Sequence, residues 1–185
     1  MSKDVPEALD YAFNDVEHAF RLLEFSIRIL TYFELKKVDL NLFGQDTTIL
    51  LNEENITFND GHFSSGEHAE LAAKTAVGAS FGASAMALDN LFEATGWNRD
   101  PASDDEFYLL WTLVYAVRNA FAHGIANPRW FVKGKYQREI EISIAGRKTA
   151  INLAALDGHE FVYAQIGGFA NWLHVKDRVL ALVRS

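Results

Sequence analysis

The stretch FYLLWTLVYAV, residues 107–117, leads directly into RNAFAHG, residues 118–124, and so joins a strongly apolar segment to three polar side chains. The apolar segment predicts a buried helix, and the glycine at the end is typical of the position just after a helix. Polar groups at the end of a buried helix need partners or take part in function. Arg118, Asn119 and His123 therefore form the leading candidate site.

The spacing of these residues indicates which of them share a surface. Asn119 and His123 are four residues apart and lie on one helix face, and Tyr115 lies on the same face one turn earlier. Arg118 lies to one side, but its long side chain can reach the same place. A cation beside an imidazole is suited to holding a phosphate and transferring protons. Tyr115 either lines this cleft or packs in the core.

The pattern Arg118-Asn119-x-x-x-His123 late in a helix resembles the motif of the HEPN superfamily. The resemblance implies a mainly α fold, a four- to five-helix bundle that forms a homodimer with the two motifs facing each other. It implies a metal-independent endoribonuclease, often a toxin paired with an antitoxin protein or a defence protein. In members without catalysis it implies a binding or interaction module. By this resemblance Arg118 holds the scissile phosphate of RNA, His123 transfers protons, and Asn119 orients either group.

The composition limits the class of protein. A chain of 185 residues with 49% apolar residues, 14 Phe and 4 Trp predicts one folded domain, residues 1–185, with a substantial core. The absence of cysteine excludes disulfides and thiolate metal sites and fits a cytoplasmic protein. No run of 18 apolar residues occurs, so we expect no membrane span, and we also expect no cofactor.

The charge is unevenly distributed. The net charge of −8 argues against a general nucleic-acid-binding protein. However, residues 1–100 hold 7 basic and 17 acidic side chains, net −10, whereas residues 101–185 hold 10 and 8, net +2. The positive region follows the motif and begins with Arg129 and Lys133, which we predict to bind substrate together with Tyr115. The alternative is a solvated edge of a hairpin protected by basic residues.

Apolar periodicity and capping signals predict four helices separated by two strand excursions. The helices are expected at about residues 6–35, 64–94, 104–123 and 157–183, and the strands near 45–58 and 129–153. The capping signals are Ser64-x-x-Glu67, Ser103-x-x-Glu106 and Asp157-x-x-Glu160. A turn is expected at Asn59-Asp60-Gly61. Gly78-x-x-x-Gly82 indicates a point where another helix crosses closely.

Other kinds of site find little support in the sequence. His62, Glu67 and His68 lie near one another but lack the spacing and the further ligand of a metal site, so none is predicted. No phosphate-binding loop, nucleophile elbow or zinc-protease motif occurs. A purely structural alternative remains for the motif: His123 caps the helix, Asn119 bonds a neighbouring backbone group, and Arg118 pairs with an acid from the first or second helix.

Overall fold

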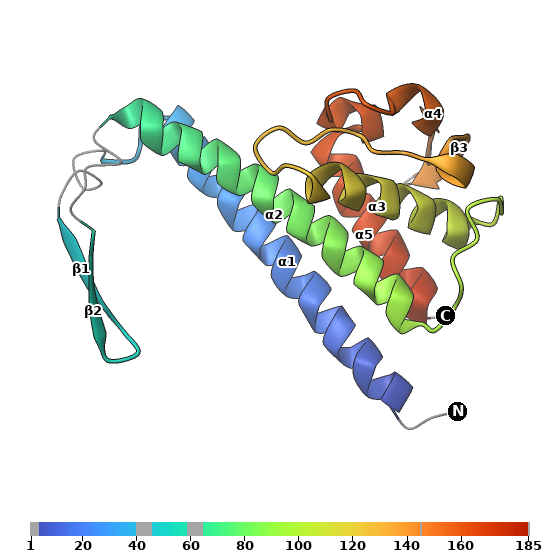
Figure 1. Cartoon of the computed structure of the whole chain (residues 1–185), viewed down its shortest axis with the longest axis horizontal. Coiled ribbons are helices and arrows are strands. Elements are labelled where there is room, and N and C mark those ends of the chain that lie inside the picture. The colour runs from blue at the N-terminus through green and yellow to red at the C-terminus, as the bar shows by residue number, and fades with distance from the viewer. Residues whose placement is uncertain (1–3, 40–45, 59–64, 145, 185) are drawn as a thin grey trace.

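The two longest helices, α1 (Asp4–Glu34) and α2 (Gly66–Ala94), pack side by side as an antiparallel pair (Figure 1). The structure is a computed structural model that describes residues 4–39, 46–58, 65–144 and 146–184. α1 buries Val16, Phe20 and Leu23, which are three and four residues apart, so the predicted amphipathic stripe is the face that meets the core.

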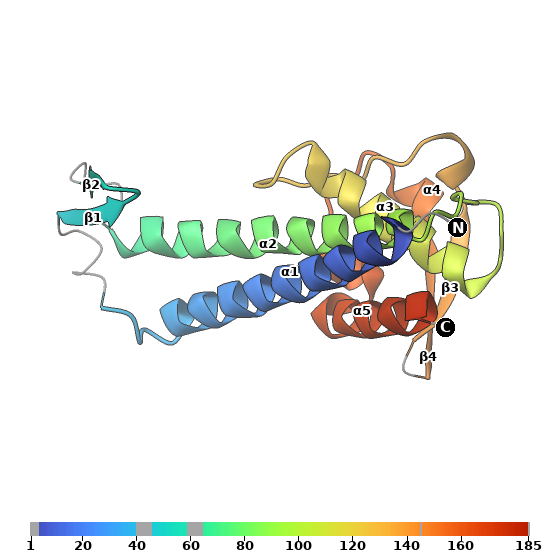
Figure 2. The ribbon, with the colours of Figure 1, turned by 90° about the horizontal axis from the view of Figure 1, so that it is seen from below.

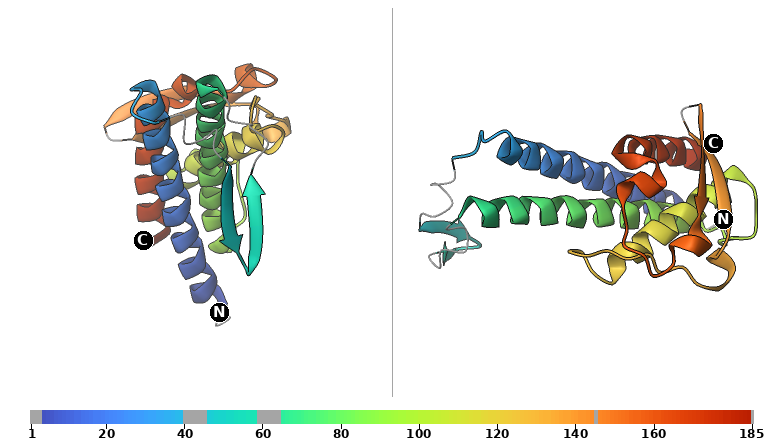
Figure 3. Two further views of the ribbon diagram at one scale, coloured as in Figure 1. Left: turned by 90° about the vertical axis from the view of Figure 1, so that its left-hand side faces the viewer. Right: turned by 90° about the horizontal axis from the view of Figure 1, so that it is seen from above.

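The fold is mainly helical with two small antiparallel strand pairs, as predicted. The remaining helices are α3 (Glu106–Ala122), the single turn α4 (Leu153–Leu156) and α5 (Gly168–Arg184), with short 3₁₀ turns η2 (Gly134–Tyr136) and η3 (Tyr163–Ile166). α1 and α3 both pack on α2 and lie on different sides of it, while α5 runs beside α1 (Figures 2 and 3). α2 is therefore the central helix.

α2 and α3 approach each other closely because glycine leaves room between them. A Cβ atom on Gly82 would lie only 2.9 Å from Cβ of Phe121, and one on Gly78 would lie 3.2 Å from the carbonyl oxygen of Ile125. The crossing predicted at Gly78-x-x-x-Gly82 is thus confirmed. It fixes the end of α3 that carries the motif against the middle of α2.

α2 is also long and apolar enough to resemble a membrane-spanning helix. Its most apolar window of 18 residues has a mean hydropathy of 1.2, and 50% of that window is buried inside the fold. A core helix passes the same test, because both kinds of helix need apolar side chains on several faces. The absence of a membrane span stays a prediction.

The strand pairs lie at opposite ends of the molecule (Figure 1). β1 (Thr47–Leu51) and β2 (Glu54–Phe58) form a hairpin beyond the far end of the α1–α2 pair, with Asn52 and Glu53 at φ +49° and +69° in its turn. β3 (Glu139–Ile144) and β4 (Arg147–Asn152) form the second hairpin. Ile140 and Ile151 face each other across it and are buried, so this hairpin belongs to the core.

The predicted start of the last helix is wrong. α5 begins at Gly168, not at Asp157, because Gly158, Gly167 and Gly168 have φ of +79°, +84° and +85°, which interrupts a right-handed helix. The carboxylate of Asp157 instead accepts a hydrogen bond from the backbone N–H of Val132, at 2.9 Å.

Two further boundaries differ from the prediction. α3 is capped by Asp105, which accepts from the N–H of Phe107 at 2.9 Å, whereas Ser103 accepts from the N–H of Asp105 in the preceding turn. Residues 129–138 form no strand beyond one bridge between Arg129 and Glu160.

Some predicted features fall on residues that are not described. Ser64, the turn at residues 59–61 and His62 lie outside the described residues. Within the described part, α2 is capped by Ser65, whose hydroxyl accepts from the N–H of His68 at 3.3 Å. The serine that caps the helix is thus one residue later than the capping signal indicates.

Candidate functional site

The motif occupies the last turns of α3, as the sequence predicts. Ala122 is the last helical residue and His123 is the C-cap, with φ −101° and ψ −5°. The imidazole of His123 is exposed, and its ring lies edge-on to Phe131 with a centroid distance of 5.1 Å. The histidine is therefore accessible from solvent and is held on one side by an aromatic ring.

Arg118 lies in different surroundings from His123. Its Nη1 donates to Oδ1 of Asn119 at 3.1 Å, and its Nε lies 3.8 Å from Oδ2 of Asp89 on α2. That Nε is buried and has no hydrogen-bond partner among the described residues. The pairing of Arg118 with an acid of the second helix, one of the alternatives from the sequence, is present. No hydrogen bond or ion pair joins Arg118 to His123 within the described part of the chain.

Asp89 is the centre of a buried polar cluster. Its side chain is only 3% exposed, and Oδ1 accepts from Nε1 of Trp111 at 2.9 Å and from Nη2 of Arg99 at 2.7 Å. The guanidinium of Arg99 lies 3.9 Å from the ring centroid of Tyr115, a cation–π arrangement. Burial raises the pKa of Asp89, and the neighbouring cations and the Trp111 hydrogen bond lower it only in part.

A small cavity of about 160 Å³ lies beside Asn119. The residues that line it are Tyr115, Ala116, Asn119, Phe131, Val132, Lys133 and Tyr136. The rings of Tyr115 and Tyr136 are 4.8 Å apart, and Nζ of Lys133 lies 5.3 Å from the ring centroid of Phe131 and 2.6 Å from Oδ2 of Asp157. A cavity of this size accommodates one small group such as a phosphate, not a whole nucleotide.

The predicted substrate-binding residues are thus divided between two places. Tyr115 and Lys133 line the cavity with Asn119. Arg129 does not line it: its side chain is exposed, and Nη1 donates to the carbonyl oxygen of Gly158 at 3.3 Å. His123 joins the cavity indirectly, through the Phe131 ring that contacts both.

Sequence reasoning missed the partners of the motif. Asp89 had a signal, because it is the only charged residue between Phe81 and Phe92, and a lone charge in an apolar helical segment requires a partner. Arg99 lies in the loop after α2, where nothing in the sequence points to its partner. Phe131 likewise lies in a loop and has no periodic pattern that places it against His123.

No metal site was predicted, and none gathers in the residues described: no three His, Cys, Asp or Glu side chains lie close enough to share an ion. His68 is exposed in the first turn of α2. The cavity beside Asn119 has a different lining, with one lysine whose ammonium is paired with Asp157, one amide and aromatic walls.

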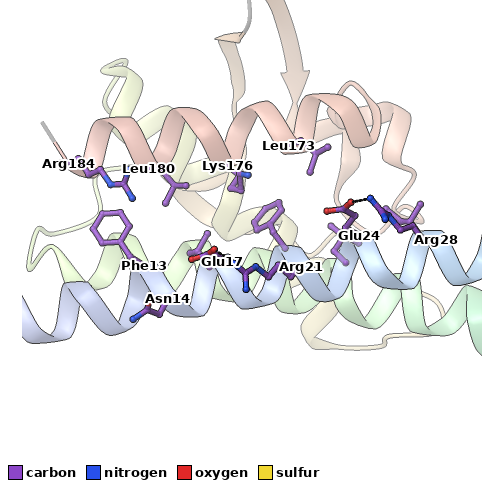
Figure 4. A pocket seen from close by; sticks show the side chains of 14 residues that line it. Phe13, Asn14, Glu17, Arg21, Glu24, Arg28, Leu173, Lys176, Leu180 and Arg184 are labelled. Carbon is purple, nitrogen blue, oxygen red and sulfur yellow. Dashed lines mark hydrogen bonds and ion pairs between the residues drawn. The ribbon is translucent and has the colours of Figure 1, made fainter.

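A larger hollow lies elsewhere, between α1 and α5. It measures about 820 Å³, with Phe13, Phe20 and Leu180 among the residues that line it, and Lys176 and Arg184 project from α5 at its edge (Figure 4). None of the residues predicted for the site lines this groove. It is therefore separate from the motif.

Known proteins add nothing to this geometry. Comparison of the chain with models of protein families, with curated proteins and with solved structures gives no match. The resemblance to the HEPN superfamily accordingly depends on the residues from Arg118 to His123 and on their place at the end of a helix.

Proposed function

We propose that this chain is a metal-independent endoribonuclease whose site is formed by Arg118, Asn119 and His123. The observation that carries the proposal is the exposed imidazole at the end of α3, beside the cavity lined by Asn119 and Lys133. An accessible proton carrier next to a cation and to an exposed aromatic ring suits the cleavage of single-stranded RNA, since the ring of Phe131 can stack a base.

The reaction that fits these groups is internal transesterification. His123 takes the proton of a ribose 2′-OH, the 2′-oxygen attacks the phosphorus, and the bond to the 5′-oxygen breaks. The leaving 5′-oxygen takes up one proton, so the products are a cyclic phosphate and a 5′-OH. Arg118 and Lys133 offset the charge that develops on the phosphate. Because one histidine cannot readily serve both oxygens, the proposal includes a second copy that contributes its own His123 in a composite homodimer site.

A second candidate function is a binding module without catalysis. The engagement of Arg118 with Asp89 and Asn119 favours it, because a guanidinium held by its own chain is less available to a phosphate. In this case the motif end of α3 would contact a partner protein such as an antitoxin. Retention of an exposed His123 favours the ribonuclease over this module.

The test is cleavage of a mixed RNA pool in the presence of EDTA by wild type, His123→Ala and His174→Ala. His174 is an exposed histidine of α5 and serves as the matched control. We expect wild type and His174→Ala to produce cyclic-phosphate ends and His123→Ala to be inactive, with equal circular dichroism for all three. Cleavage by all three would remove His123 from the reaction, and cleavage by none would favour the binding module.

A further inference from the structure

α1 carries a second apolar stripe that faces away from the core. Tyr11, Leu22, Phe25 and Tyr32 are between 48% and 65% exposed. At 100° per residue they fall within about 80° of the helix circumference, roughly opposite the buried Val16. Large apolar side chains that are aligned on one face and left in water are typical of a contact surface.

The stripe has the spacing of a coiled coil. Positions 11, 18, 25 and 32 are seven residues apart, and positions 22 and 29 fall four residues after 18 and 25. His18 is exposed and Ile29 is half-buried, so all six positions lie toward the same outer face. Apolar residues at alternating steps of three and four pack against another helix of the same kind, knobs into holes. The spacing therefore favours a helix as the occupant.

The distribution of charge along α1 favours a second copy of α1, in antiparallel orientation, as the helix that packs on this stripe. Residues 4–20 carry five acidic side chains and no Lys or Arg, net −5, whereas residues 21–37 carry four basic and two acidic side chains, net +2. A parallel pair of α1 helices would place the two acidic halves together and Asp15 against its own copy. An antiparallel pair with Tyr11 opposite Tyr32 places each acidic half beside residues 23–39 of the other copy, which include Arg28 and nearby lysines.

We propose that two copies of this chain associate through antiparallel packing of their α1 outer faces. Aromatic side chains bury roughly 150–250 Å² each when fully covered. About half of that area is still exposed on the four large residues of the stripe. With flanking atoms added, each copy could bury on the order of 500 Å² of surface, and the pair about 1,000 Å² in total. This total is near the lower limit for a specific interface.

This surface is distinct from the contact that a composite active site needs. α1 and α3 pack on different sides of α2 (Figures 1 and 2), so the α1 outer face points away from the end of α3 that carries His123. Association through α1 leaves the two motifs far apart. The inference therefore goes beyond the proposed function and does not depend on it.

Light scattering after size exclusion tests the association with a matched pair of variants. The masses are compared with that of wild type, because the composite active site would form a second contact between copies. We expect Leu71→Glu to keep the wild-type mass, a multiple of the chain mass of 20.8 kDa, and Phe25→Glu to have half of it. Leu71 is 64% exposed on α2, so it controls for the loss of an exposed apolar residue on another helix. A wild type that stays monomeric at the highest concentration measured, or an assembly that Leu71→Glu dissociates and Phe25→Glu does not, would overturn the proposal.

Orientation can be tested separately because the chain contains no cysteine. Tyr11→Cys and Tyr32→Cys proteins are mixed and treated with a flexible bismaleimide crosslinker. Antiparallel packing predicts crosslinked pairs in the mixture and not with either protein alone, since identical ends would lie roughly 30 Å apart. Crosslinking of Tyr11→Cys with itself would indicate parallel packing and would contradict the argument from charge.

Discussion

Arg118 and His123 are five residues apart in one motif, yet they belong to different parts of the molecule. The side chain of Arg118 is 39% exposed and pairs with a buried carboxylate of α2, whereas His123 is exposed at the helix end and its ring lies edge-on to Phe131 of a loop. A motif that looks like one site in the sequence can thus contain one residue that stabilises the fold and one residue that is free to react.

The geometry of α3 explains this division. Arg118 lies on the side of α3 that faces α2. The two helices cross at Gly82, and Asp89 follows about two turns later along α2, within reach of Arg118. His123 comes after the last helical residue, where the chain turns away from α2. The following predictions test whether the two ends of the motif are as independent as this contrast indicates.

The largest effect is expected from Asp89→Ala. Removal of this carboxylate leaves two guanidinium groups and the Trp111 N–H without their buried acceptor, so the free energy of unfolding should fall by about 3–5 kcal/mol. Urea denaturation measures it, with Glu93→Ala as the control, because Glu93 pairs with Arg99 at 3.2 Å but is 60% exposed. A loss for Asp89→Ala no larger than that of the control would contradict a structural role for the cluster.

Gly82→Ala is expected to lower the stability of the fold by less than Asp89→Ala does. The new Cβ would meet Phe121 at 2.9 Å, and overpacking of this kind costs about 1–3 kcal/mol, offset in part by the helix propensity of alanine, about 1 kcal/mol. The midpoint of thermal unfolding is the measurement. Gly96→Ala tests the opposite case, because a Cβ there meets no atom within 4 Å and only its φ of +75° opposes the change. An increase in stability for Gly82→Ala would mean that the helices do not cross so closely.

The pH dependence of the cluster is the next test. Burial raises the pKa of Asp89 above its ordinary value of 3.8, so its contribution to stability is greatest at acid pH and declines as pH rises through the raised pKa. Asp89→Asn lacks this titration. The difference in unfolding free energy between wild type and Asp89→Asn should therefore shrink from acid to neutral pH. A difference that grows would show that the ion pair with Arg99 outweighs burial.

The smallest effect on stability is expected from His123→Ala. Its side chain is exposed and makes no hydrogen bond within the described part of the chain, so the free energy of unfolding should change by no more than about 0.5 kcal/mol. Arg118→Ala removes an ion-pair partner of Asp89, so it should lower the free energy of unfolding by more than His123→Ala does in the same urea titration. If both substitutions cost the same, the two ends of the motif are not separate.

The local features of the fold follow from the order of the residues alone. The periodic stripe of α1, the end of α3 near His123 and both hairpins depend on residues close in the chain, and each was predicted. The glycine spacing on α2 also indicated the crossing helix, because only a missing side chain permits such an approach. Where glycines hold left-handed conformations, as at the start of α5, the same local reasoning failed, since a capping signal competes with backbone geometry that sequence does not display.

The partners of the site residues, in contrast, depend on the packing of the whole molecule. Asp89 meets Trp111 across 22 residues, and Lys133 meets Asp157 across 24, so both contacts depend on how helices and loops pack. The separation between Arg118 and His123 also depends on this packing. So does the position of Arg129, whose side chain contacts Gly158 and does not line the cavity. Local propensity depends on neighbours in sequence, whereas burial and charge pairing depend on which surfaces meet, and that is settled by the whole fold.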